Sequence, residues 1–172
     1  MRKTLLALLI AGTASSWAQA QPGPTDPQIA HIVVTANQVD VDAGKVAAKR
    51  GSTPEVRAFG QQMVDDHTAV NKQATALVQR LKVTPENNPT SADLKKGGVD
   101  NLAALGKLKG KQFDKAYVDH EVAYHQAVID AVDKTLLPAA KNADLKALIE
   151  KVRPALVHHL EHAKQMQAQL GA

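Results

Sequence analysis

The stretch Ala143–Leu170, ADLKALIEKVRPALVHHLEHAKQMQAQL, decides the fold class of this chain. Apolar residues recur in it at alternating steps of three and four, the spacing that places side chains on one face of an α-helix. The members of this face are Leu145, Ile149, Val152, Leu156, His159, Ala163, Met166 and Leu170. Because His159 is its one polar member, the sequence predicts an amphipathic helix over residues 143–170 that turns one imidazole toward a core.

Prolines, glycines and capping residues divide the rest of the mature chain into further helical stretches. Asp26 before Pro27 and Thr53 before Pro54 are typical of an N-cap followed by the first helical position. The other predicted long helices cover residues 27–50, 54–82 and 112–137.

The connection between the second and third long helices, residues 83–111, is much longer than the others. It contains several prolines and glycines and one predicted short helix at residues 91–105. Short connections join antiparallel neighbours, whereas a connection of this length can cross a whole bundle. The sequence therefore predicts an all-α fold, a ferritin-like antiparallel four-helix bundle with one long crossover between helices 2 and 3.

Each of the other long helices also carries a polar residue on an apolar face. His67 interrupts the face of the second helix, and His125 interrupts that of the third. In the first helix two apolar faces compete, and only one of them includes Asp40. Measured from the nearest turns at about 1.5 Å per residue, Asp40, His67, His125 and His159 lie at similar heights along the bundle.

Three imidazoles and a carboxylate that converge in a bundle core form a natural ligand set for a divalent metal ion. This set suits zinc, copper or a single iron. Glu121, one turn from His125, and His162, one turn from His159, are further candidate ligands, and Asp66 is a candidate to orient a neighbouring ring. Alternatively, the same core residues form a structural His–Asp network that fixes helix register.

A di-iron carboxylate site of the ferritin type is not predicted. Such sites need Glu-x-x-His on two helices and a glutamate on each of the others. The residues three positions before the candidate histidines are Val64, Val122 and Leu156, so the motif is absent. The sequence also lacks a glycine-rich phosphate loop.

Residues 1–20 carry the pattern of a secretory signal peptide. Two basic residues precede an apolar run, and Ala18-Gln19-Ala20 supplies the small residues of a cleavage site. We expect cleavage before Gln21, a flexible leader over residues 21–27 and a single bundle domain over residues 28–172. The expected destination is the bacterial periplasm.

Composition excludes several classes of function. The 172 residues include no cysteine, which rules out disulfide scaffolds, thiolate metal sites and cysteine nucleophiles. Hydrophobic residues make up 44% and aromatic residues only 3%, which favours helices over a β-sandwich. Cleavage would lower the net charge from +4 to about +2, too little to indicate a nucleic-acid partner. After cleavage, no transmembrane segment is expected.

Three motifs resemble a known family. Val56–His67 resembles the F-A-x-x-M-V-x-D-H hallmark of domain of unknown function 4142, and Phe113–Tyr117 followed by His125 resembles its F-D-x-x-Y … H segment. Pro154–Leu160 is similar to its P-x-L-x-x-H-L segment. The resemblance implies an exported bacterial protein with a ferritin-like bundle and no settled activity. Family members commonly carry glutamate where this chain carries Asp40.

Three functions remain open at this point. The first is a periplasmic metal-binding protein that serves storage, buffering or stress protection. The second is a non-catalytic structural or interaction module of the cell envelope with a His–Asp network in its core. The third is a metal-dependent redox enzyme with an open coordination position for oxygen or peroxide. Tight metal binding separates the second from the other two.

Overall fold

The computed structural model describes residues 23–171, which form an all-α fold as predicted. Its helices are α1 (Asp26–Arg50), α2 (Pro54–Leu81), α3 (Pro89–Gly106), α4 (Gly110–Ala131), α5 (Leu137–Ala139) and α6 (Ala143–Gly171), with a π-helical segment η1 (Val132–Leu136) between α4 and α5. No strand occurs within residues 23–171. The predicted signal peptide at residues 1–20 and the first two residues of the predicted leader lie outside the described residues.

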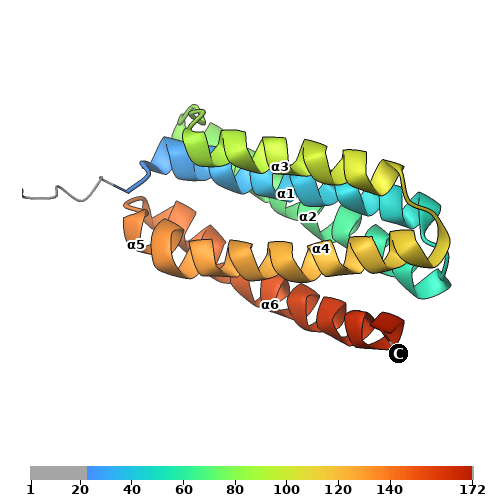
Figure 1. Cartoon of the computed structure of the whole chain (residues 1–172). Coiled ribbons are helices and arrows are strands. Elements are labelled where there is room, and N and C mark those ends of the chain that lie inside the picture. The colour runs from blue at the N-terminus through green and yellow to red at the C-terminus, as the bar shows by residue number, and fades with distance from the viewer. Residues whose placement is uncertain (1–22, 172) are drawn as a thin grey trace, which may run out of the picture.

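The long helices lie side by side in a bundle-like arrangement (Figure 1). α1 and α2 form one antiparallel pair, and α4 and α6 form a second pair that is joined through η1 and α5. α3 runs back along α1, from the end where α2 stops to the end where α4 begins. The long connection of the sequence is therefore itself largely helical, and α3 extends beyond the predicted residues 91–105 at both ends.

α1 is buried on two sides, which explains the two competing apolar faces in its sequence. Asp40 is only 3% exposed and lies near histidines of α2 and α4. Ile32 and Val39, which belong to the competing face, are buried as well. The side chain of Val39 packs against Gly98 of α3, where an added Cβ would lie 2.9 Å from it. The structure thus turns Asp40 toward the core and covers the second face with α3.

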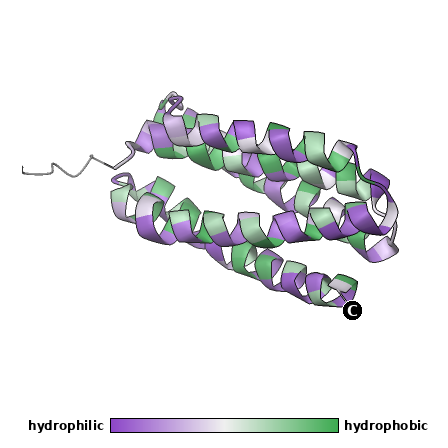
Figure 2. Ribbon diagram, in the orientation of Figure 1, coloured by the Kyte–Doolittle hydropathy of each residue, from purple (hydrophilic) through white to green (hydrophobic). Residues whose placement is uncertain are grey.

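The apolar core consists of two clusters. One is built from Ile29, Ile32, Val33, Ala74, Leu77, Ile129, Val132, Leu136, Leu145, Ile149, Leu156 and Leu160, and the other from Ala43, Ala47, Val56, Phe59, Met63, Leu105, Phe113, Tyr117, Val118, Ala163 and Met166. Figure 2 shows the alternation of hydrophobic and hydrophilic residues along each helix that such a core requires. Among residues 23–171, no helix combines the length and apolarity needed to cross a membrane.

The start of α1 differs from the prediction that Asp26 caps it. Thr25 is the N-cap: its hydroxyl accepts a hydrogen bond from the Gln28 N–H, and its own N–H donates to Gln28 Oε1 at 3.1 Å. The Asp26 carboxylate instead accepts hydrogen bonds from the backbone N–H groups of Lys141 and Asn142, both at 2.9 Å. Asp26 therefore ties α1 to the turn before α6, and α1 includes residues 26 and 27, which were predicted to belong to the leader.

The predicted third helix, residues 112–137, is not continuous. It begins slightly earlier, at Gly110, and its α-helical part ends at Ala131, where η1 follows with the wider i→i+5 turn of a π-helix. Both Val132 and Leu136 of η1 remain buried. The three-and-four spacing of apolar residues passes through this segment unchanged, so the pattern alone did not reveal it.

Two features fix the α1–α2 pair. An added Cβ on Gly60 would lie 2.6 Å from the backbone nitrogen of Ala48, so only glycine allows the two helices to approach this closely. The buried carboxylate of Asp114, on α4, accepts hydrogen bonds from the Ser52 N–H at 2.8 Å, the Ser52 hydroxyl and the Thr53 N–H at 3.3 Å. Asp114 thereby holds the α1–α2 turn against α4.

Candidate metal centre

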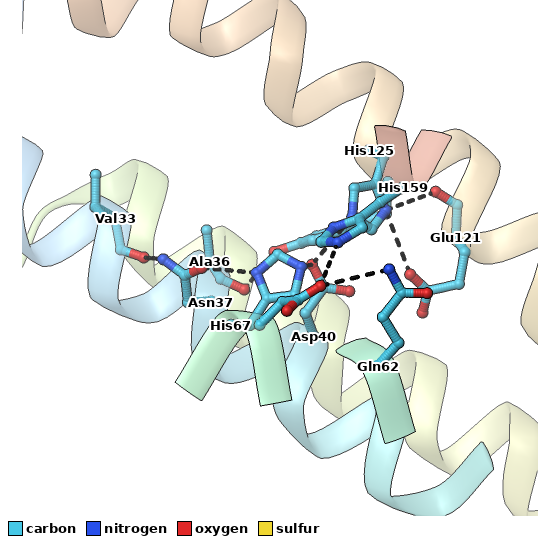
Figure 3. A network of polar contacts seen from close by, with 11 residues as sticks. Val33, Ala36, Asn37, Asp40, Gln62, His67, Glu121, His125 and His159 are labelled. Carbon is cyan, nitrogen blue, oxygen red and sulfur yellow. Dashed lines mark hydrogen bonds and ion pairs between the residues drawn. The ribbon is translucent and has the colours of Figure 1, made fainter. Parts of the chain in front are cut away.

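The structure brings the four principal candidates together in the interior, one each from α1, α2, α4 and α6 (Figure 3). They are Asp40, His67, His125 and His159, and none is more than 3% exposed. The three ring centroids are 5.2 to 5.6 Å apart. We call His67, His125 and His159 the three-histidine cluster. The four residues therefore lie at one level along the bundle, as predicted from their distances to the nearest turns.

Each ring of the cluster has one nitrogen that lacks a hydrogen-bond partner among the described residues. These atoms are Nε2 of His67, Nε2 of His125 and Nδ1 of His159. One ring nitrogen from each of the three residues lies within 4.8 Å of the others. Leaving a buried polar atom unsatisfied costs about 1–3 kcal/mol. Three such atoms in one place therefore indicate a missing partner.

The second nitrogen of each ring faces an oxygen acceptor. His67 Nδ1 lies 2.7 Å from Asn37 Oδ1, His159 Nε2 lies 2.9 Å from Asp66 Oδ2, and His125 Nδ1 lies 3.1 Å from the backbone oxygen of Glu121. A neutral imidazole that donates its one N–H to such an acceptor keeps the lone pair on the opposite nitrogen. The surroundings thus select the tautomers that leave all three unpartnered nitrogens free to donate a lone pair.

Asn37 is a participant that the sequence analysis missed. Its Nδ2 group donates to the backbone oxygen of Val33 at 2.7 Å, which leaves Oδ1 facing His67 (Figure 3). Asn37 is only 8% exposed. It stands three residues before Asp40 on the same helix, so helical spacing could have placed it on the same face.

Two carboxyl groups lie beside the rings. Asp40 Oδ2 is 3.3 Å from His67 Nε2 and 3.8 Å from His125 Nε2, both in contacts that do not form hydrogen bonds. Glu121 is fully buried, and neither of its carboxyl oxygens has a hydrogen-bond partner within the described chain. Asp40, Glu121 and His125 also form a second group whose potential ligand atoms lie within 4.8 Å of one another. Glu121, a further candidate ligand from the sequence, therefore lies in a second group that shares His125 with the cluster, and its Oε2 is 3.3 Å from His125 Nδ1.

Burial controls the ionisation of the centre. Removal from water raises the pKa of Asp40 well above its usual range and raises the pKa of Glu121 to about 7. The same desolvation, together with the neighbouring histidines, lowers the pKa of His67 to about 2. Burial also lowers the pKa of His159. At neutral pH, His67 and His159 are therefore neutral and able to donate lone pairs.

A model of the family described as Domain of unknown function (DUF4142) matches residues 11–166. The chain belongs to this family. Neither the search of curated proteins nor the search of solved structures gave a match. The resemblance drawn from the three sequence motifs is therefore confirmed. The DUF4142 description assigns no activity, so the evidence on function comes from the residues of the centre.

The centre of this DUF4142 protein has dimensions that suit a transition metal. Zinc binds imidazole nitrogen and carboxylate oxygen at about 2.0–2.2 Å, and the edge of a tetrahedron with such bonds is ~3.4 Å. The separation of 3.3 Å between His67 Nε2 and Asp40 Oδ2 matches that edge, and the 3.8 Å separation from His125 Nε2 is slightly longer. Copper and iron also use nitrogen and oxygen donors of these kinds.

The remaining predicted residues lie around the centre. Asp66, on α2, is about half exposed, and its carboxylate lies beside the ring of His159. This is the position expected of a residue that orients that ring. His162 packs edge-on against Phe59, with ring centroids 4.9 Å apart. Within residues 23–171, His162 belongs to neither of the two groups able to hold a metal.

Proposed function

We propose that this protein binds one divalent transition metal ion, zinc, copper or iron, through the three-histidine cluster and Asp40, with Glu121 as a further ligand. The observation that carries the proposal is the set of three buried, unpartnered ring nitrogens, each opposite a nitrogen that faces an oxygen acceptor. Metal-binding histidines use this arrangement to fix their ring orientation. The role that follows is metal storage, metal buffering or protection against metal stress.

Binding of the ion would displace protons from the centre. Burial holds the pKa of Glu121 near 7 and that of Asp40 well above its usual range, so carboxyl protons compete with the cation. The bound ion would supply positive charge that compensates the two ionised carboxylates in a site nearly closed to water. Asn37, Asp66 and the backbone of Glu121 keep the three rings oriented with or without the ion.

The same proposal includes a ferritin-like four-helix core made by α1, α2, α4 and α6. Its support is the order of directions along the chain: α2 and α4 run the same way because α3 returns the chain to the opposite end between them (Figure 1). One long crossover between the second and third core helices is the ferritin-like connectivity. A metal bound in the middle would then join all four helices.

We also propose that the protein acts after export to the bacterial periplasm. The support is the basic start, the apolar run and the Ala18-Gln19-Ala20 site of residues 1–20. Mass spectrometry of the protein from native cells tests this directly, with a mature chain that begins at Gln21 as the expected result. Full-length protein in the cytoplasm would contradict it.

The experiment that tests the metal site is elemental analysis of untagged protein purified from its native compartment. It compares the wild type with His67→Ala/His159→Ala and with His31→Ala/His158→Ala, a control that removes the same number of imidazoles outside the proposed ligand set. We expect about one metal ion per chain in the wild type and in the control. We expect none in the cluster variant, with circular dichroism showing that it remains helical.

Two results would refute the proposal. One is a metal-free wild type whose melting temperature does not rise when zinc, copper or iron is added. The other is equal metal content in the wild type and in the cluster variant. Either result would favour the structural His–Asp network and turn attention to protein partners.

A further inference from the structure

A pocket of about 310 Å³ adjoins the three-histidine cluster. It is lined by residues of all five long helices and of η1. Thr90 of α3, Ala127 of α4 and Ala155 of α6 lie on its wall and are exposed, so the pocket reaches the surface. Its volume falls at the lower end of the range for small-molecule sites.

The pocket is polar at one end and apolar along the rest. Asp40, Asp66, His67, His159 and Asn37 form the polar end, so two carboxyl groups lie there. The apolar walls include Val33 and Ala36 of α1, Val128 and Ala131 of α4, and Val152 and Leu156 of α6. Such walls fit a hydrocarbon chain, because removal of its apolar surface from water is favourable.

The length of the pocket indicates a chain of medium size. It extends along α6 from His159 to Ile149, ten residues apart, which corresponds to about 15 Å of helix. Leu136 of η1 closes the same region. An extended chain of about ten carbon atoms, with C–C bonds of ~1.5 Å, fits within this length.

The chemistry of the polar end selects the head group. No lysine or arginine occurs among the described residues that line the pocket, so the protein offers no side-chain cation to an anionic head. A metal ion held by the three-histidine cluster and Asp40 would supply the missing positive charge, and the carboxylate of the ligand would bind it as a fifth ligand in place of Glu121. Carboxylate oxygen is a common ligand of such ions.

We propose that the metal-loaded protein binds a medium-chain monocarboxylate, with its carboxylate on the metal and its hydrocarbon chain in the pocket between α1, α4 and α6. This inference rests on the proposed metal site. The pocket would then be a ligand site whose affinity depends on the bound metal. This role would be separate from storage or buffering of the ion.

The test is isothermal titration calorimetry on the whole mature protein, first with zinc and then with decanoate after unbound zinc is removed. Acetate tests whether the hydrocarbon chain is needed for binding, and decylamine tests whether the head group must be negatively charged. Zinc-free protein tests whether decanoate binding needs the metal. Ala131→Phe and Ala155→Phe fill the pocket without altering a proposed ligand. Ala123→Phe places the same ring on the exposed face of α4, outside the pocket, as the matched control.

We expect decanoate to bind zinc-loaded protein at least ten-fold more tightly than zinc-free protein, and far more tightly than acetate. Ala131→Phe and Ala155→Phe should weaken decanoate binding at least ten-fold with zinc affinity unchanged, and Ala123→Phe should behave as the wild type. Normal zinc binding without saturable decanoate binding would overturn this inference alone. So would equal decanoate binding to zinc-free protein, tighter binding of decylamine, or unchanged decanoate binding in both filled variants. Failure of the first titration, with zinc and likewise with copper and iron, would instead refute the metal site itself.

Discussion

Replacement of Asn37 by leucine removes an oxygen acceptor without touching any proposed metal ligand. The 2.7 Å contact between Asn37 Oδ1 and His67 Nδ1 holds the N–H of the ring on the side away from the centre. Leucine has the same branching and the same number of side-chain heavy atoms but no acceptor, so the ring becomes free to carry its proton on Nε2, the atom proposed to bind the metal. Loss of such a ring-orienting partner typically weakens metal affinity 10- to 100-fold, or by about 1.4–2.7 kcal/mol.

The same change should also affect the metal-free protein. His67 Nδ1 would lie buried without an acceptor, and Val33 would lose the hydrogen bond from Asn37 Nδ2. The unsatisfied group alone should lower the free energy of unfolding by about 1–3 kcal/mol. Urea unfolding of the zinc-free protein measures this cost separately from the loss of metal affinity.

Zinc affinity is best measured by competition with a chromogenic chelator at neutral pH. Asn37→Asp keeps an acceptor oxygen and should remain close to the wild type, and Gln38→Leu makes the same chemical change at the exposed neighbouring position. Zinc binding by folded Asn37→Leu within two-fold of the wild type would refute this role of Asn37. The role is also refuted if Gln38→Leu is weakened equally.

Burial and packing lead to four further predictions. Burial raises the pKa of Glu121 from 4.5 to about 7, so the metal-free wild type should lose stability as pH rises through this range, and Glu121→Gln should gain stability relative to it. Urea unfolding at pH 5 and pH 8 measures the gain, and a difference that does not grow with pH would contradict it. Asp114→Ala should lower the free energy of unfolding by at least about 2 kcal/mol because it removes three hydrogen bonds to a buried carboxylate, with zinc affinity unchanged by calorimetry. Gly60→Ala should destabilise the fold by about 1–3 kcal/mol in thermal unfolding. At Gly97 of α3, an added Cβ would have no atom within 4 Å, so Gly97→Ala should instead stabilise the fold by up to ~1 kcal/mol.

The helical spacing of apolar residues predicted the long helices and four core polar residues. This was possible because residues three and four positions apart lie on the same face of a helix, and that face is the one that becomes buried. His67, His125 and His159 were identified in this way, and all three are buried. The face of α1 stayed ambiguous because α3 covers its other side, a contact between distant segments that no local pattern reports. The structure resolves this ambiguity by placing Asp40 beside His67.

Features that depend on a partner elsewhere in the chain were missed. Asp26 was expected to cap α1, yet its carboxylate is used by the backbone of Lys141 and Asn142, far along the sequence. The role of Asn37 depends on a ring from α2, and the pocket depends on how the two helix pairs face each other. Local spacing identifies which residues face inward, but their hydrogen-bond partners require the packed fold.

A purely structural network does not balance the hydrogen bonds of this core. Among the described residues, the three-histidine cluster turns three unpartnered nitrogens inward, and the carboxyl groups of Asp40 and Glu121 lie beside them. With the ring tautomers set by their other partners, all five groups accept hydrogen bonds. Among the described residues, the protons that can serve them are one on each carboxyl group and the hydroxyl proton of Tyr117, which lies beside Glu121. In a site this buried, each acceptor left over costs about 1–3 kcal/mol. A divalent cation binds the lone pairs of several acceptors at once, so the composition of the centre favours a metal over a self-contained network.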